Sequence, residues 1–399
     1  MSSVIVKWMH ELRRSNWMLT AIIAALLIIS VAFVYSARYI GEDKEVYPLY
    51  HRQIIWIAAG IASYITLSLY DYHRFKRLAW AIYAAGLILL VIVLIMGTTI
   101  YGAKRWIMLF GKIGIQPSEV AKLSTIILLA QQLSLPGRNL ARFNDLSYIL
   151  SLIGLPVILI MLQPDLGTAI VFVPTALLMM FVAGMPIRYI VVVSAIGITV
   201  VTLILSAMFL PAKLGAGKAA QQRIRNLTFL SEYQQGRIEV FFNPEKDPLG
   251  AGWNKRQSEI AVGSGGLKGK GYLKGTQNIL GFLPRSVAPT DFIYSVIAEE
   301  KGFIGSLTVL SLFFGVLMFG MFTALRTQDS MGRLLCVGIV SLIFCHVFIN
   351  IAMTVGLMPI TGLPLPLLSY GGTFMIMMMS SLGIIQSVYI RSHRRDSYM

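Results

Sequence analysis

The sequence predicts an all-α polytopic membrane protein with about ten transmembrane helices. Of its 399 residues, 56% are hydrophobic and only 13% are charged, and the mean hydropathy is +0.72. A soluble globular domain carries about 25% charged residues, so this composition excludes that class. Apolar runs long enough to cross about 30 Å of hydrocarbon recur along the chain. We expect residues 1–399 to form a single integral membrane domain.

These apolar runs give the expected spans in order. The first follows a basic stretch without a small-residue cleavage site, which indicates a retained helix rather than a signal peptide. The fifth is short, which leaves a re-entrant or strongly tilted helix open. The ten ranges are 17–36, 53–70, 78–98, 119–135, 148–162, 167–185, 188–210, 303–325, 334–357 and 374–390.

Basic residues predict the orientation, because short cytoplasmic loops are enriched in lysine and arginine. One side carries Lys7, Arg13, Arg14, Arg74, Lys76, Arg77, Arg138, Arg142, Arg188, Arg326, Arg333, Arg391, Arg394 and Arg395. The other side carries fewer: Arg38, Lys44, Arg52, Lys104, Arg105 and Lys112. We therefore expect a multi-pass protein with both termini in the cytoplasm.

Residues 211–290 are the exception, a loop of about 80 residues between the seventh and eighth spans on the extracytoplasmic side. Its many lysines and arginines face only five acids. A solvated surface explains any single one of them, but an anionic partner explains the loop better. Its glycine-rich stretch "GSGGLKGKGYLKGTQ" fails as a P-loop, since Ser264 replaces the first glycine and Gly271 follows Lys270. The glycines favour a close approach of the backbone to a lipid headgroup or a sharp turn, and a flexible loop remains open.

Two helix starts face the same outer side. "IQPSEVAK" places Ser118 as an N-cap, Glu119 in the first turn and Lys122 one turn later, and "QPDLGTA" places Asp165 at a cap. Capping and a local ion pair explain both motifs adequately.

The two basic residues of "GAKRW", Lys104 and Arg105, lie at the same level as these helix starts. Cations near outward helix N-termini suit a diphosphate.

Asp291 opens the run "TDFIYSVIAEEKGF", which Glu299 and Glu300 close. A helix from about residue 290 separates them by about 12–14 Å, too far for the carboxylate pair of a glycosidase. Asp291 therefore acts alone or with cations. A lone base suits attack of a sugar hydroxyl on a sugar diphosphate, because that leaving group needs no proton. We expect Glu299 and Glu300 to pair with basic residues or to cap the next span.

The cysteine and histidine residues do not form a predicted set of metal ligands. Cys345 and His346 are adjacent within the ninth span, but the five histidines are scattered, so packing is favoured over a transition-metal site. No resident cofactor is expected with certainty. A divalent cation, Mg²⁺ or Mn²⁺, could assist with phosphate, and no nucleic-acid partner is expected.

The successive motifs "GAKRW", "IQPSEVAK", "QPDLGTA", "NPEKDPLGAGW", "QSEIAVGSGGLKGKG", "TDFIYSVIAEEKGFIG" and "GLMPITGLPLPLLSYGG" resemble those of the SEDS family over about residues 17–390. The details resemble its elongation members more than its division members. The resemblance implies a ten-helix peptidoglycan glycosyltransferase of the bacterial plasma membrane. It would polymerise lipid II and work with a class B penicillin-binding protein.

By the same resemblance, Asp291 is the essential acid of the family. The substrate-binding positions are Lys104, Arg105, Glu119, Lys122, Gln257 and Ser264. The stretch "FLPRSVAPTDFIY" is about two residues longer than the family pattern and lacks its Glu and His, which puts any role of those two positions in doubt.

We therefore predict a glycan polymerase with Asp291 as general base, its site formed partly by residues 211–290. Two rivals remain: a lipid II transporter (flippase), which often shows inverted repeats that are not evident here, and a non-catalytic scaffold of the elongation or division machinery.

Overall fold

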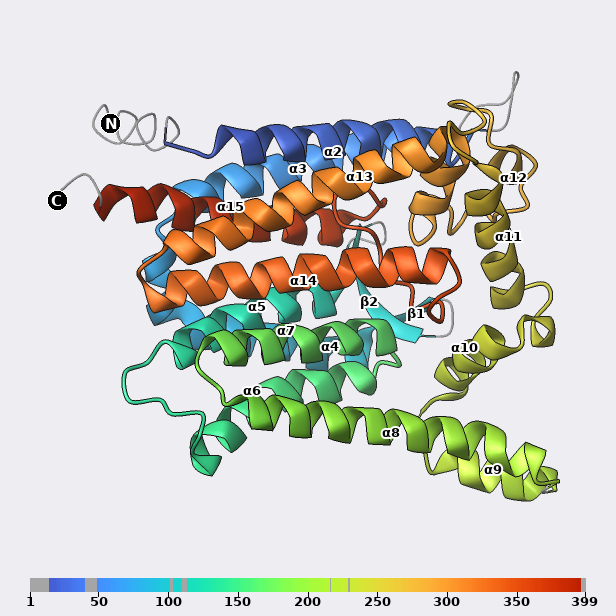
Figure 1. Ribbon diagram of the computed structural model, residues 1–399, viewed down its shortest axis with the longest axis horizontal. Helices are drawn as coiled ribbons and strands as arrows, with labels where there is room; N and C mark the ends of the chain where they lie inside the picture. Colours follow the sequence, from blue (N-terminus) through green and yellow to red (C-terminus); the bar gives the residue numbers. More distant parts are fainter. Residues whose placement is uncertain are drawn as a thin grey trace.

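The computed structural model describes residues 14–39, 49–100, 103–109, 113–215, 217–228 and 230–395. Within them, ten helices run side by side along the long axis, and each overlaps one predicted apolar run (Figure 1). They are α2 (Trp17–Ser36), α3 (Leu49–Leu69), α4 (Phe75–Met96), α5 (Pro117–Leu133), α6 (Phe143–Met161), α7 (Leu166–Val182), α8 (Ile187–Lys213), α13 (Ile293–Arg326), α14 (Ser330–Thr354) and α15 (Gly372–Arg395). The predicted all-α polytopic membrane fold is confirmed.

Eight of these helices are long and apolar enough to cross a membrane, and α6, the expected short span, is one of them. The other two, α5 and α7, have 17 residues each, at the lower limit for a span. Most residues of α5 are buried by its neighbours, including Glu119 and Lys122. A short and polar helix is tolerated there because the protein, not lipid, surrounds it.

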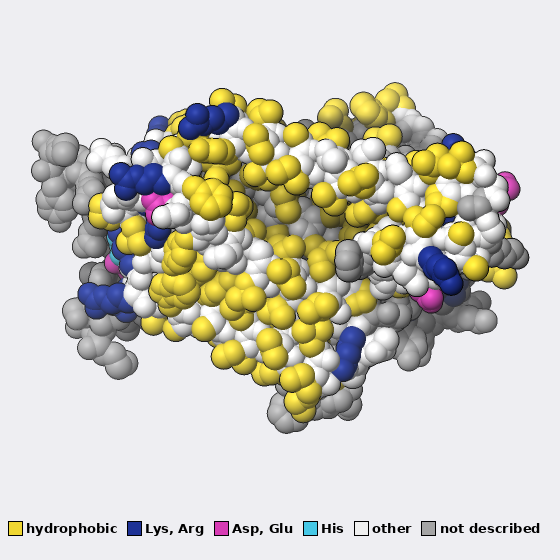
Figure 2. Space-filling view, turned by 90° about the horizontal axis from the view of Figure 1, so that it is seen from below, with side chains coloured by type: hydrophobic (Ala, Val, Ile, Leu, Met, Phe, Trp, Pro, Cys, Tyr) yellow, Lys and Arg dark blue, Asp and Glu magenta, His cyan; other side chains and the backbone are white. Residues whose placement is uncertain are grey.

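The helices of the bundle differ in how far they are buried by their neighbours. Helices α14 and α15 are mostly buried, whereas α8 is almost wholly exposed and lies at the lower edge in Figure 1. Seen from that side, hydrophobic side chains cover the middle of the molecule, and lysine and arginine side chains gather mainly toward its two ends (Figure 2). This distribution is that of a surface that faces lipid between two aqueous phases.

The segment between α8 and α13 covers one end of the bundle, opposite the end where α2 begins and α15 ends (Figure 1). It contains α9 (Lys218–Asn226), α10 (Glu232–Phe242), the 3₁₀ helix η2 (Pro244–Lys246), α11 (Ala251–Ser264) and α12 (Thr276–Ile279). A further 3₁₀ helix, η1 (Tyr72–Arg74), precedes α4. The long predicted loop is therefore largely helical.

The glycine-rich stretch packs against α13. A Cβ at Gly265 would lie 2.0 Å from the Ala298 carbonyl oxygen, and one at Gly269 would lie 2.2 Å from that of Glu300. The amides of Lys270 and Gly271 donate to the carbonyls of Glu299 and Glu300, both at 3.0 Å. The sharp turn is found, since Gly266, Gly269 and Gly271 have positive φ. The backbone approaches α13, and an approach to a headgroup stays a prediction.

A small antiparallel sheet follows α4, with strand order β1 (Thr98–Ile100), β2 (Ala103–Leu109) and β3 (Ile113–Ile115). Thr99 pairs with Lys104, and Ile107 pairs with Ile115. The sequence did not predict this sheet. It matters because β2 carries both basic residues of the "GAKRW" motif.

One capping prediction is wrong and one is confirmed. Ser118 does not cap α5, because the helix begins one residue earlier at Pro117, with Gln116 in the cap position. Asp165 does cap α7, accepting from the Thr168 amide at 3.2 Å. Several charges used for orientation lie outside the described residues: Lys7, Arg13, Lys44 and Lys112. Orientation in the membrane therefore stays a prediction.

Candidate active site

Asp291 lies in a tight turn directly before α13. The amides of Thr290 and Phe292 both donate to the Val287 carbonyl, at 3.2 and 3.1 Å. The turn is also tied to the loop that joins α14 and α15, residues 356–372, hereafter the 356–372 loop. The Ser369 hydroxyl donates to the Thr290 carbonyl at 2.5 Å, and the Tyr370 amide donates to that of Pro289 at 2.8 Å. These bonds fix the backbone on both sides of Asp291.

Arg237 of α10 lies beside this acid. A Cβ built on Gly362 would be 3.3 Å from Arg237 Nη1 and 3.5 Å from Asp291 Oδ2, so the two charged groups flank the same glycine. Gly362 has φ of +73°, a conformation that favours glycine. Arg237 also donates to the Ile360 carbonyl at 2.7 Å, and its guanidinium lies 4.6 Å from the centre of the Tyr233 ring.

Arg105 reaches the same place from β2. Its guanidinium lies 5.6 Å from the centre of the Tyr233 ring, 3.6 Å from Asp165 Oδ1, and donates to the Pro164 carbonyl. Tyr233 therefore contacts two arginines, one from the sheet and one from α10.

The two arginines line a pocket with about 420 Å³ of empty space, part of it open to solvent. Its wall also includes Gly167, Tyr233, Met358 and Thr361. The 356–372 loop thus lines a cavity, where irregular backbone is tolerated within a membrane protein. A partly open pocket with two guanidinium groups is suited to an anion such as a phosphate.

The environment of Asp291 shifts the pKa of its carboxyl group. Removal from water raises the pKa of this carboxyl above its ordinary value, while Arg237, the Thr290 hydroxyl and Arg105 act in the opposite direction. A raised pKa makes the carboxylate a stronger base than a free aspartate. The nearby arginines favour the ionised form, which is the form that accepts a proton.

Lys104 does not join this group. Its ammonium donates to the carbonyls of Leu94 and Ile95, both at 2.8 Å. These carbonyls belong to the last turn of α4, where helix carbonyls lack partners. The predicted basic pair is therefore divided: Arg105 lines the pocket and Lys104 caps a helix.

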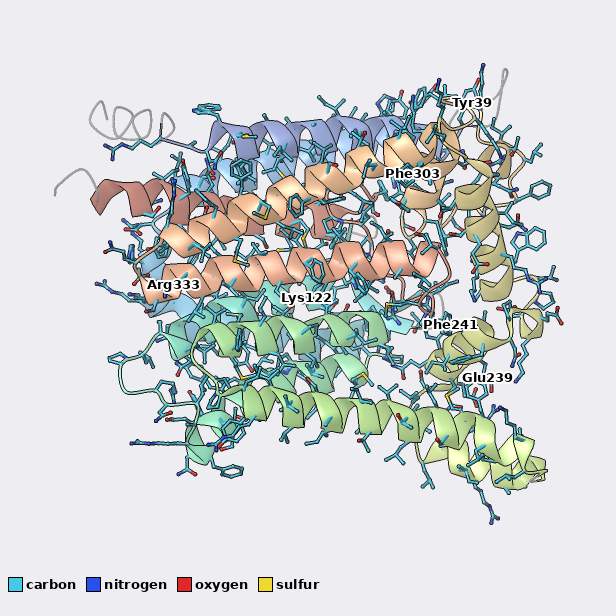
Figure 3. The ribbon with its side chains drawn as sticks, viewed as in Figure 1. Tyr39, Lys122, Glu239, Phe241, Phe303 and Arg333 are labelled. Atoms are coloured by element: carbon cyan, nitrogen blue, oxygen red, sulfur yellow. The ribbon has the colours of Figure 1, made fainter. Side chains whose placement is uncertain are left out.

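Glu119 and Lys122 form the local ion pair that their spacing predicted, at 2.8 Å. Both side chains are 2% exposed, and Lys122 lies in the interior of the bundle, between its two ends (Figure 3). Lys122 also contacts His346 Nε2 at 2.7 Å. Neither residue of the pair lines the pocket between Arg105 and Arg237.

The two predicted binding residues of α11 lie apart from this pocket as well. Gln257 is buried where α11 packs, and the Ser264 hydroxyl donates to the Ala261 carbonyl at 3.1 Å. The pocket wall includes neither residue. Their assignment to substrate stays a prediction.

Sequence reasoning missed Arg237 and Tyr233. Arg237 was one basic residue among many in the outer loop, so its charge alone did not mark it. The available signal was the spacing "YQQGR", which puts an aromatic ring and a guanidinium one helical turn apart.

The described residues provide no preformed set of side-chain ligands for a divalent cation. Among the described residues, no group of three or more histidine, cysteine, aspartate or glutamate side chains is placed to hold a metal. Asp291 and Asp165 both face guanidinium groups. A cation at this pocket would need most of its ligands from phosphate and water, as Mg²⁺ often has.

Comparisons with known proteins identify the family of this chain. Residues 12–394 match the family model of FtsW, RodA and SpoVE, described as cell cycle proteins. The chain is 36% identical to the peptidoglycan glycosyltransferase MrdB of Escherichia coli K12, covering 94% of this chain and 92% of that protein. It is 34% identical to the peptidoglycan glycosyltransferase RodA of Treponema pallidum, covering 94% and 98%. A relative named FtsW, from Trichlorobacter lovleyi, is 32% identical, covering 96% and 95%.

Solved structures are similar over nearly the whole chain. One, from work on polymerisation and crosslinking by a peptidoglycan synthase complex, has a TM-score of 0.74 at 28% identity, covering 95% of this chain and 99% of that chain. The rod shape-determining protein RodA of Thermus thermophilus has a TM-score of 0.65 at 27% identity, covering 96% and 98%. With its ten-helix bundle and its motifs in the expected order, this chain belongs to the SEDS family of FtsW, RodA and SpoVE.

Proposed function

We propose that this protein is a peptidoglycan glycosyltransferase that joins lipid II units into glycan strands during cell elongation. The observation that carries the proposal is Asp291 beside Arg237, one of two arginines that line an open pocket at the end of a membrane bundle. Asp291 itself is not part of the pocket wall and meets the pocket through Arg237. Relatives that share about a third of the sequence over nearly the whole chain are named for this activity.

In the proposed reaction, the 4-hydroxyl of the GlcNAc of one lipid II attacks the anomeric carbon at the undecaprenyl-diphosphate end of the growing glycan. A new glycosidic bond forms, and the bond from the anomeric carbon to the diphosphate oxygen breaks. Asp291 takes the hydroxyl proton as general base. The diphosphate leaves as an anion, so no second carboxyl is required to protonate it.

Arg105 and Arg237 would bind the diphosphate. Both guanidinium groups are already held, one by Asp165 at 3.6 Å and one by the Ile360 carbonyl at 2.7 Å. Groups held before the substrate arrives stabilise developing charge without reorganising during the reaction. Mg²⁺ or Mn²⁺ bound to the diphosphate would add to the positive charge of the two arginines. A loss of activity on adding a chelator would support that part of the proposal.

The membrane arrangement follows from the same assignment. The pocket lies at the end covered by α9–α12, so this end would face outward, where the peptidoglycan is built, with both termini in the cytoplasm. The partner would be a class B penicillin-binding protein transpeptidase. One structural relative comes from a synthase complex that couples polymerisation to crosslinking, which supports such a partner.

The test is an assay of the purified protein with lipid II in detergent and then in vesicles. A polymerase makes glycan chains in both. A lipid II transporter moves the lipid across the vesicle membrane without making polymer, and a scaffold does neither. Absence of polymer from folded protein, with its partner transpeptidase present but inhibited, would overturn the proposed function.

A further inference from the structure

Two polar side chains on one face of α14, His346 and Asn350, have no role in the chemistry proposed above. They are four residues apart, so they lie one turn apart on the same side of the helix. Both are fully buried. A buried histidine and asparagine inside a membrane bundle need partners, because an unpaired polar group there is costly.

Their partners are consecutive carbonyls of the 356–372 loop. Asn350 Nδ2 donates to the Leu363 carbonyl at 2.7 Å, and His346 Nδ1 lies 3.3 Å from the Pro364 carbonyl. This stretch of the loop is irregular, so its carbonyls have no helical partners. The two side chains of α14 supply the missing donors.

Asn350 also reaches the turn that carries the proposed base. The same Nδ2 donates to the carbonyl oxygen of Asp291 itself at 2.9 Å. One amide group therefore joins α14, the 356–372 loop and the backbone of Asp291. The loop in turn positions Arg237, which donates to the Ile360 carbonyl at 2.7 Å.

The buried ion pair in α5 determines how His346 is protonated. Lys122 has only donors, and its ammonium lies 2.7 Å from His346 Nε2 and 2.8 Å from Glu119 Oε1. Nε2 must therefore accept, which places the ring proton on Nδ1, facing the Pro364 carbonyl. The Lys122–Glu119 pair thus acts on the loop through His346.

We propose that His346 and Asn350 are positioning residues, which hold the 356–372 loop and Asp291 in the geometry needed for transfer, with Lys122 and Glu119 orienting His346. This inference rests on the proposed function. It predicts that loss of either donor lowers kcat by a larger factor than it raises the KM for lipid II. Neither side chain touches the pocket that binds the diphosphate, and the effect on KM comes only through the 356–372 loop, which forms part of the pocket wall.

The test compares two substitutions at one position. His346→Gln keeps both functions, since the Gln oxygen can accept from Lys122 and its amide can donate to Pro364. His346→Leu roughly keeps the volume of the side chain but can neither accept from Lys122 nor donate to the Pro364 carbonyl. We expect His346→Leu to lower kcat by about ten- to a hundredfold, the range that a small misplacement of reacting groups produces, and His346→Gln to recover most of it. Phe348→Leu, at a side chain of the same helix that is 57% exposed, is the control.

A purely structural role would lower the melting temperature of His346→Leu and the yield of folded protein, with kcat per folded molecule unchanged. That result would overturn the proposal, as would a rise in KM alone. If His346→Leu does not fold, Asn350→Ser tests the same proposal. The serine side chain is shorter, so its hydroxyl no longer reaches the carbonyls of Leu363 and Asp291. Hydrogen exchange of the 356–372 loop should then rise as kcat falls, and kcat at the wild-type value would contradict the proposal. Wild-type protein that makes no glycan would instead refute the proposed function.

Discussion

Asp291 and Glu299 are acids eight residues apart at one end of the bundle, and their surroundings differ sharply. Glu299 Oε1 accepts from Lys270 Nζ at 2.7 Å, the Thr276 hydroxyl at 3.0 Å and the Gln277 amide at 3.0 Å. Its neighbour Glu300 accepts from the Ser36 hydroxyl at 2.5 Å. Asp291 instead faces Arg237 and Arg105, and the Thr290 hydroxyl beside it donates to the Val287 carbonyl at 3.2 Å.

The difference separates an acid that the fold holds from the acid proposed as the base. The lone pairs of Glu299 are used within the fold, where they hold the glycine-rich stretch against α13. Asp291 has its backbone fixed from three directions, and its carboxylate lies beside Arg237, which lines the pocket. A base needs that combination, because it must be held in place and still have a lone pair for the proton.

The largest expected effect after loss of the base itself is at Arg237. Arg237→Ala removes a positive charge that lines the pocket and faces Asp291, and loss of one such group costs about 10²–10³-fold in turnover. Arg237→Lys should recover only part, because an ammonium cannot bind an anion through a planar fork. Arg256→Ala, at an exposed partner of Glu245, is the control in a polymerisation assay. Equal activity in all three variants would show that Arg237 does not serve the reaction.

Residues such as Arg237 show where sequence reasoning ends. The ten spans, the Asp165 cap and the Lys122–Glu119 pair were predictable, because hydropathy and helix spacing are local properties. The meeting of Arg105, Arg237 and Asp291 was not, since β2, α10 and the turn before α13 are brought together only by tertiary packing. Lys104 and Arg105 could not be told apart for a related reason: adjacent residues of a strand point to opposite faces, and nothing in the sequence indicated the strand.

The acid limb of the pH–rate profile should also depend on Arg237. The proposed base, Asp291, would work as a carboxylate, so activity should fall as pH drops through its pKa, which burial raises above the usual value for aspartate. Arg237 is the main opposing charge, so Arg237→Ala should raise the pKa further and move the acid limb of kcat/KM to higher pH. A shift to lower pH would contradict the assigned electrostatics.

Substitution of Glu299 should affect stability and not chemistry. Glu299→Gln removes the charge that faces Lys270, and a buried polar group left without its partner costs about 1–3 kcal/mol. We expect a lower melting temperature with an unchanged kcat per folded molecule. A large fall in kcat at an unchanged melting temperature would mean that this acid takes part in the reaction.

The smallest effect is expected at Lys104. Lys104→Met removes two hydrogen bonds to the end of α4, worth about 1 kcal/mol each, and leaves the pocket untouched. Glycan synthesis should stay near the wild-type rate, whereas Arg105→Ala should lower it strongly. Equal losses in the two variants would mean that both cations of this motif bind substrate.

The most direct test of the account is the rate of glycan synthesis by Asp291→Asn, measured on purified protein with lipid II while the partner transpeptidase is inhibited. The substitution keeps the shape of the side chain and removes the negative charge that makes its oxygens basic enough to accept the proton. General-base catalysis contributes about 10²–10⁴-fold, so the rate should fall by at least that much, with the melting temperature and partner binding unchanged. Polymerisation by Asp291→Asn at near the wild-type rate would show that Asp291 is not the base.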